Sequence, residues 1–135
     1  MLRTWILSVA CSVSLLGGCV SVTHVQAGRH DQFRNALVDS CRSIQASDFH
    51  AARDHLDDAQ SLARGPEQAA KVVDLGLMLD GAESLHEGRP QEAANSWLSI
   101  RDRSLKGQVI ALADAQGIDI YAISQAQNNR QETSQ

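Results

Sequence analysis

A tight turn and the helix that follows it are contained in residues 88–100, GRPQEAANSWLSI. Gly88 is suited to end a preceding helix, because glycine readily adopts the left-handed conformation found just after helix C-termini. Pro90 is suited to the first turn of the next helix, where its missing N–H costs nothing. Three apolar residues then recur at spacings of four and three, on one face of a helix: Ala93, Trp97 and Ile100. The stretch therefore predicts two helices joined by a short turn.

The same helical period runs through most of the chain on both sides of this turn. The inward residues expected of a first helix, which starts near Arg29, are Phe33, Leu37, Cys41 and Ile44. Those of a second helix, which Asp48 can cap, are Ala52, Leu56, Ala59 and Leu62. Gly65 and Pro66 separate it from a third helix over residues 67–87, whose inward residues are Ala70, Val73, Leu77, Gly81 and Leu85. Two further helices are expected over residues 105–116, ending at Gly117, and 118–126. No segment alternates as a strand would, so the domain is predicted to be all-α.

The turn and its following helix occur twice with one spacing. The residues Ser47, Ala52, Leu56 and Ala59 are matched 41 positions later by Gly88, Ala93, Trp97 and Ile100. Each copy has a small residue at the turn, an alanine five positions on and a large apolar residue four positions after that. A third copy, Gly117 followed by Ala122, is degenerate.

Over residues 30–103 this pattern resembles the tetratricopeptide repeat. The resemblance implies a short array of stacked antiparallel helical hairpins, in which the alanine lets two helices approach closely and the aromatic residue packs on the neighbouring helix. The chain departs from that family in a repeat longer than roughly 34 residues, and in Asp80 and Ser84 at usually apolar positions. The alternative is a small antiparallel helical bundle.

The N-terminus has the pattern of a secretory signal. Arg3 precedes an uncharged apolar run over residues 5–16, which is shorter than the roughly 20 residues that a spanning helix needs. The run ends in four residues that resemble the lipobox of bacterial lipoproteins: Leu16, Gly17, Gly18 and Cys19. This resemblance implies cleavage before Cys19 and acylation of that cysteine with fatty acids such as palmitate. An ordinary signal peptide cut elsewhere, for example after Ala27, is the alternative.

The lipobox divides the chain into four expected parts. These are a signal peptide (1–18), a lipidated tether (19–28), a helical-hairpin domain (29–126) and a polar tail (127–135). Several acyl chains anchor a protein stably, whereas one is marginal. The resemblance to bacterial lipoproteins further implies, from their sorting by the residue after the cysteine, that Val20 directs the chain to the periplasmic face of the outer membrane, if the source is diderm.

Charge and cysteine content narrow the partners of the mature chain. Without Arg3 it has 11 basic and 16 acidic side chains, which argues against binding nucleic acid or anionic lipid headgroups. Cys11 leaves with the signal and Cys19 carries lipid, so Cys41 remains and no internal disulfide is expected. Cys41 lies on an apolar stripe, which predicts a buried, inert thiol.

No constellation of residues predicts catalysis, a metal or a cofactor. His50 and His55 are five residues apart, which points them in different directions on a helix, and His86 has no second histidine near it. The sequence lacks a Gly-x-Ser-x-Gly turn, a phosphate loop and a dinucleotide glycine pattern. The residues Asp54, His55, Asp57 and Asp58 are expected to form a solvated helix face. We therefore expect no enzyme.

The sequence favours an envelope lipoprotein that acts as a protein-interaction scaffold or assembly accessory factor. The candidate partner-binding residues are Ile120, Tyr121 and Ile123, and Trp97 is expected to be a core anchor between two helices. One alternative is a module that binds a small molecule or peptidoglycan fragment, or an accessory enzyme subunit, through the acidic face at residues 54–58. A third hypothesis is self-association into a homo-oligomer through the incomplete repeat.

Overall fold

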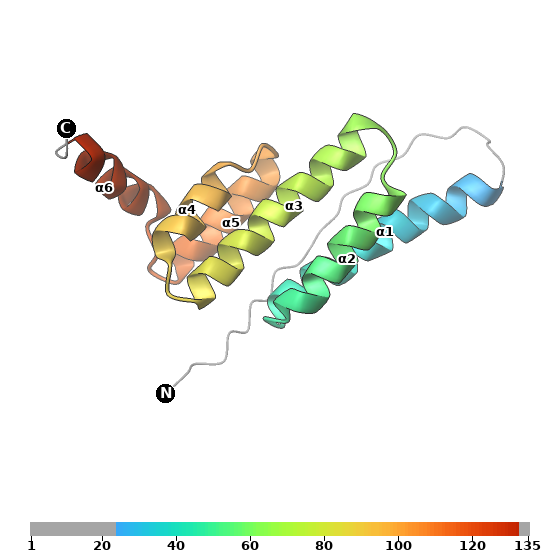
Figure 1. Ribbon diagram of the computed structural model, residues 1–135, viewed down its shortest axis with the longest axis horizontal. Coiled ribbons are helices and arrows are strands. Elements are labelled where there is room, and N and C mark those ends of the chain that lie inside the picture. Colours follow the sequence, from blue (N-terminus) through green and yellow to red (C-terminus); the bar gives the residue numbers. More distant parts are fainter. Residues whose placement is uncertain (1–23, 133–135) are drawn as a thin grey trace. The chain divides into compact units, whose positions relative to one another are not determined.

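The computed structural model describes residues 24–132, with the side chains of residues 28–126 and Asn129. These residues form six α-helices and no strand, which confirms the all-α prediction. The helices, shown in Figure 1, are α1 (His24–Gln45), α2 (Phe49–Leu62), α3 (Gly65–His86), α4 (Pro90–Leu98), α5 (Arg103–Ala115) and α6 (Ile120–Glu132). The predicted signal peptide and lipobox, and residues 19–23 of the predicted tether, lie outside the described residues.

The chain divides into two compact units, the first ending at Val72 and the second beginning at Val73. In the first unit α1 and α2 pack along each other as a hairpin, and α3 begins. In the second unit α4 packs against both α5 and α6, and the rest of α3 packs against the core that includes Trp97 of α4. Helical hairpins are therefore present as predicted, and the predicted helical-hairpin domain, residues 29–126, includes parts of both units.

Three helix ends share one turn geometry. After α1, α3 and α5 the backbone enters the left-handed region at Ser47 (φ 59°), Gly88 (φ 75°) and Gly117 (φ 77°). In each turn the next amide donates to the carbonyl five residues earlier, at 2.9, 2.8 and 2.9 Å for residues 48, 89 and 118. The helix ends predicted from Gly88 and Gly117 are thus confirmed. The match between positions 47 and 88 extends from sequence to backbone geometry.

Aspartates cap the N-termini of three helices. Oδ1 of Asp48 accepts from the amide of Ala51 at 3.1 Å, as the sequence predicts. Oδ1 of Asp102 accepts from two amides in the first turn of α5, at 2.8 and 2.9 Å. Oδ1 of Asp119 accepts from the amide of Ala122 at 2.9 Å. Each carboxylate satisfies backbone donors that the helix itself leaves unpaired.

Two helices are longer than the sequence predicts. α1 begins at His24, inside the expected tether, rather than at Arg29. α6 continues to Glu132, through most of the expected polar tail. Neither region contains proline, and both contain residues of high helix propensity, namely Gln26 and Ala27 in the first and Gln127, Arg130 and Gln131 in the second. A helix can therefore continue where the apolar period has already ended.

The predicted inward face of α3 is wrong at its beginning. Val73 is 54% exposed and Ala70 is also exposed, whereas Val72, Leu75 and Leu79 are buried. Apolar side chains occupy most sides of α3 over residues 72–79. Periodicity alone does not select one face in such a helix.

Candidate functional site

A groove lies between α1 and the first turns of α3, and all of its lining belongs to the first unit. Its volume is about 360 Å³, and we call it the α1–α3 groove. The ten residues that line it are His30, Phe33, Arg34, Leu37, Val38, Cys41, Arg64, Glu67, Gln68 and Lys71.

Each wall of the groove follows one helix face. The residues on α1 are spaced three, one, three, one and three apart, from His30 to Cys41, which extends about 16 Å along the helix. On the other wall the lining begins at Arg64, just before α3, and continues at the same spacing to Lys71. The groove is therefore an elongated slot rather than a round pocket.

The floor of the groove is apolar. Phe33 and Cys41 are buried, with 5% and 9% of their surface exposed, and Leu37 and Val38 are half-buried. Burial of Cys41 agrees with the prediction from its place on the apolar stripe. These side chains offer an apolar surface that is only partly covered by the first unit itself.

The rim of the groove is mostly cationic. Lys71 Nζ lies 2.9 Å from Oε1 of Glu67, and this hydrogen bond, with the charge of Lys71, lowers the pKa of Glu67 below its ordinary value. Arg34 Nη2 lies 3.7 Å from Oδ1 of Asp31. Arg64, which is exposed, uses its backbone N–H to donate to Oε1 of Gln68 at 2.6 Å. Three cationic side chains thus line the groove against one carboxylate, in a chain whose net charge is −4.

The acidic face of α2 remains a set of exposed side chains. Asp54, Asp57 and Asp58 are all exposed, and His55 is half-buried. His50 Nδ1 lies 3.2 Å from Oδ2 of Asp54, and both side chains are mostly exposed. Within residues 24–132, no group of three or more His, Cys, Asp or Glu side chains is arranged to hold a metal ion. No observation favours a ligand site on this face.

The residues predicted to pack between repeats lie in the helix interfaces. In the first hairpin Ala52 and Ala59 are 0% exposed and Leu56 is buried. Ser40 of α1, also 0% exposed, donates from Oγ to the carbonyl of Ala52 at 3.0 Å. In the second unit Ala93, Trp97 and Ile100 are buried in one apolar cluster, whereas Gly88 is exposed at its turn.

Trp97 joins α4 to α3, as the sequence predicts for a core anchor. Its indole N–H donates to the carbonyl of Met78 at 3.1 Å, so its one polar atom is satisfied. The ring lies against Gly81, where an added Cβ would overlap the indole. Gly81 therefore provides the space that the tryptophan occupies.

A buried carboxylate that the sequence analysis did not single out organises the start of α5. Asp74 is 5% exposed, and its two oxygens accept from the amides of Arg101 and Asp102 at 3.0 and 2.9 Å. Asp102 is in turn the N-cap of α5. The only sequence signal is an aspartate inside an apolar run, which requires a hydrogen-bonding partner when buried.

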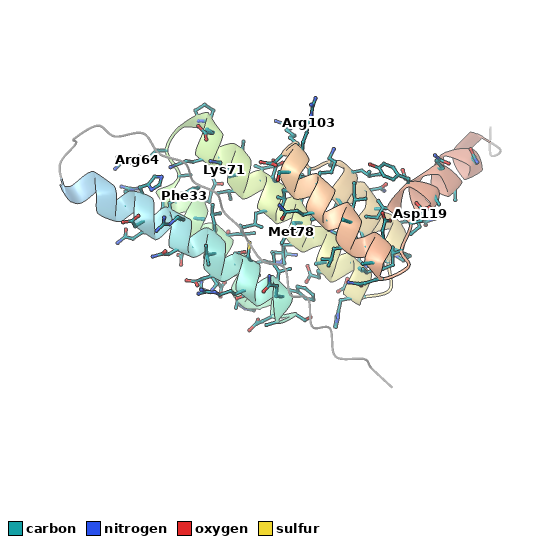
Figure 2. All side chains as sticks on the ribbon, turned by 180° about the vertical axis from the view of Figure 1, so that it is seen from behind. Phe33, Arg64, Lys71, Met78, Arg103 and Asp119 are labelled. Atoms are coloured by element: carbon teal, nitrogen blue, oxygen red, sulfur yellow. The ribbon has the colours of Figure 1, made fainter. Side chains whose placement is uncertain are left out.

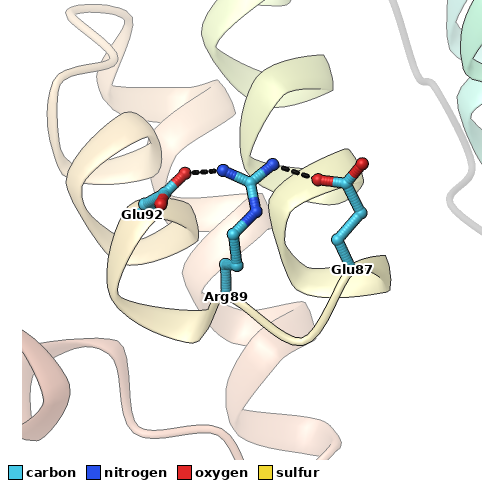
Figure 3. A network of polar contacts seen from close by, with 3 residues as sticks. All are labelled: Glu87, Arg89 and Glu92. Carbon is cyan, nitrogen blue, oxygen red and sulfur yellow. Dashed lines mark hydrogen bonds and ion pairs between the residues drawn. The ribbon is translucent and has the colours of Figure 1, made fainter.

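The turn between α3 and α4 has a small ionic network, shown in Figure 3. The guanidinium of Arg89 pairs with Glu87 through one nitrogen and with Glu92 through the other. All three side chains are about half exposed. The network connects residues on both sides of the turn. Exposed ion pairs of this kind each contribute little to the free energy of unfolding.

The three predicted partner-binding residues of α6 do not share one environment. Ile120 is 1% exposed within the core cluster of the second unit, so it is a packing residue and is not available to a partner. Ile123 is half-buried against the same cluster. Tyr121 is 53% exposed and is the only one of the three that is largely accessible.

Comparison with known proteins gives no family to which the chain can be assigned. No protein-family model, no curated protein and no solved structure matches it. In the part of the chain from residue 24 to 132, none of the helices has both the length and the apolar character required to cross a membrane.

Proposed function

We propose that this chain is a lipid-anchored envelope protein that acts as an interaction scaffold and holds a segment of a partner protein in the α1–α3 groove. The anchor would be Cys19, at the periplasmic face of the outer membrane if the source is diderm. Confinement to that surface raises the effective concentration of the domain for a partner in the same layer.

The observation that carries the proposal is the groove itself. It combines a partly covered apolar floor at Leu37 and Val38 with charged side chains on both rims. Apolar surface surrounded by polar residues is a mark of protein–protein interaction sites. The groove also follows one helix face for about three turns, the shape of surfaces that accept a helical segment.

The start of α1 defines how far from the membrane this anchor would hold the helical region. Only four residues separate Cys19 from the first residue of α1. A segment of that length spans at most roughly 18 Å when fully extended. Acylation at Cys19 would therefore hold the first residue of α1 within that distance of the bilayer surface.

Site-specific photo-crosslinking in cells tests the scaffold. A photoreactive residue at position 38, in the groove, should give a discrete adduct with an envelope protein. The same residue at position 111, which is exposed on α5, serves as the control. The proposal requires an adduct at 38 that is absent at 111. Equal adducts at both positions, or none at 38, would contradict it.

Fractionation tests the anchor independently. Cys19→Ser should abolish acylation, leave the signal uncleaved by the lipoprotein peptidase and remove the mature protein from the lipoprotein fraction. Metabolic labelling with a fatty acid gives the direct readout. A Cys19→Ser chain that is processed and fractionates as the parent does would show that this cysteine carries no anchor.

A further inference from the structure

We propose that the partner segment in the α1–α3 groove is an acidic amphipathic helix. This inference rests on the proposed function and adds the chemistry of the partner. The apolar side of that helix would lie on Phe33, Leu37 and Val38. Its carboxylates would lie beside the cationic rim.

The charge of the groove differs in sign from that of the whole chain. Arg34, Arg64 and Lys71 line it, and Glu67 is the only acidic residue among the lining side chains. The whole chain has a net charge of −4. A segment rich in glutamate or aspartate would be attracted to the rim and repelled by the net negative charge of the rest of the chain, which would direct it to this site.

Two of the three cationic side chains already lie near carboxylates of this chain, so the three should not contribute equally to binding a carboxylate of the partner. Lys71 is hydrogen-bonded to Glu67, and Arg34 is in a long ion pair with Asp31. Arg64 has its backbone N–H engaged by Gln68, and its exposed side chain extends from the connection between α2 and α3. Figure 2 shows Arg64 and Lys71 on the same side of the first unit as Phe33. We therefore expect Arg64 to be the principal contact for a carboxylate.

The geometry favours a helix over an extended peptide. Both walls of the groove are helix faces with side chains spaced three and four apart. An extended peptide lying on the apolar floor would bury backbone N–H and C=O groups, and residues 24–132 form no strand whose edge could bond them. A helix satisfies its own backbone and presents a stripe of apolar side chains at the same spacing as the groove.

A small ligand fits the groove less well. Small-molecule sites usually contain a few buried polar groups that converge on the ligand and orient it. Here the floor is apolar, and the charged groups stand on the rim at Arg34, Glu67 and Lys71, all of which have much of their side chain exposed. This arrangement suits a long partner that crosses the groove and extends beyond it.

Binding of designed peptides to the full, lipidated chain in detergent tests the proposal. The probe is a fluorescent peptide of about 15 residues, long enough to form a helix, with leucines spaced three and four apart and glutamates elsewhere. The control peptide has lysine in place of each glutamate. Fluorescence anisotropy measures both affinities, and we expect the acidic peptide to bind more tightly, by about tenfold or more.

A double variant with a charge-matched control locates the site. Arg64→Glu with Lys71→Glu should weaken binding of the acidic peptide by about tenfold and strengthen binding of the basic one. Arg101→Glu with Arg103→Glu changes the net charge equally, at exposed residues outside the groove, and should alter neither affinity. Both substituted pairs are exposed, so circular dichroism should show unchanged helix content.

Three outcomes would overturn the inference. One is equal affinity of the parent chain for the two peptides. The second is an equal loss of binding in the two double variants, which would indicate attraction to the whole surface. The third is displacement of the acidic peptide by vesicles of anionic phospholipid, which would indicate that the groove accepts lipid.

The peptide experiment and the crosslinking experiment fail in different ways. A partner that crosslinks at position 38 while the acidic peptide does not bind would leave the scaffold proposal standing and overturn the acidic helix. Binding of the acidic peptide that depends on Arg64 and Lys71, with no adduct at 38 in cells, would support the groove chemistry and contradict the scaffold.

Discussion

The α1–α2 and α3–α4 hairpins have the same turn but fill the space between their helices differently. In the first hairpin Ala52 and Ala59 are fully buried and let the two helices approach closely. In the second, Trp97 occupies the position that corresponds to Leu56 and reaches α3 at Gly81. The turn thus fixes the reversal of the chain, while the sizes of the facing side chains decide how the helices pack.

The position that faces the second helix shows why one repeat accommodates a tryptophan. Gly81 corresponds, 41 residues on, to Ser40 of the first hairpin. Ser40 is 0% exposed and bonds to the carbonyl of Ala52, so its side chain fills the interface. At Gly81 any Cβ would overlap the indole. A large residue on one helix therefore requires a missing side chain on the other.

The largest effect is expected from truncating the large side chain of each hairpin. Trp97→Ala should lower the free energy of unfolding by about 4 kcal/mol, because it leaves a cavity and removes the bond to Met78. Leu56→Ala should cost less, about 2–3 kcal/mol. Urea denaturation followed by circular dichroism measures both. A larger loss for Leu56→Ala would show that the tryptophan is not the main anchor.

The second-largest effect is expected from removing the buried side chains that form hydrogen bonds with the backbone in each unit, Asp74 and Ser40. Asp74→Ala removes two charge-assisted bonds and leaves two backbone amides without their acceptor, which should cost about 3 kcal/mol. Ser40→Ala removes one neutral bond and should cost about 1 kcal/mol. Urea denaturation again measures the loss in the free energy of unfolding for each variant. Equal losses would mean that the Asp74 bonds contribute no more than a neutral contact.

Exchanging residues between the repeats should reveal a coupled pair. Gly81→Ser, which introduces the residue of the first hairpin, should destabilise by about 2 kcal/mol because it overpacks the indole. Combining it with Trp97→Leu should cost less than the sum of the two single changes. Gly107→Ser on α5, where a Cβ meets nothing within 4 Å, is the control and should change stability little. Additive effects at 81 and 97 would contradict the direct contact.

The two turns should show opposite changes in stability when glycine is removed from one and introduced into the other. Gly88→Ala places a side chain at φ 75° and should destabilise by about 1 kcal/mol. Ser47→Gly relieves the left-handed serine at φ 59° and should stabilise by about 0.5–1 kcal/mol. Thermal melting shows both signs. A destabilised Ser47→Gly chain would indicate that the serine side chain supports its turn.

The smallest effect concerns the pH dependence of the Glu67–Lys71 pair. Because the pKa of Glu67 is lowered in the folded chain, its contribution to stability is present above its ordinary value of 4.5 and is lost as the pH falls through the folded value. Glu67→Gln should therefore lower the melting temperature slightly at about pH 7 and leave it unchanged at about pH 2. A difference that persists in acid would assign the effect to something other than this ion pair.

The helix ends could be predicted from local sequence, whereas the helix faces could be predicted only in part. The residues that mark these ends act through their own backbone preferences or through the nearest amides, so the prediction does not depend on distant contacts. They are Asp48, Gly88, Pro90 and Gly117. The faces of α2 and α4 were also predictable, since Ala52 and Trp97 lie on clear apolar stripes. The beginning of α3 was not, because its apolar residues point in most directions.

The candidate site was not visible in the sequence for a related reason. Phe33, Leu37 and Cys41 were predicted as core residues, and they also form the floor of a groove. Arg64 and Lys71 belong to no recognisable sequence motif. They come to lie beside α1 only when the helices pack, which the linear sequence does not show. Ile120, proposed from sequence as a partner contact, is buried by helices whose packing the sequence does not specify.

By itself, the sequence determined an all-α chain, the positions of most of its turns and the correspondence between residues 47–59 and 88–100. These follow from short-range preferences of the backbone and from helical periodicity, which each segment expresses on its own. Only the tertiary structure decided that Asp74 is buried against the start of α5, that Gly81 receives Trp97, and that cations from two helices line one groove. Those features depend on which surfaces meet, and residues distant in the chain acquire a shared environment only when their helices pack.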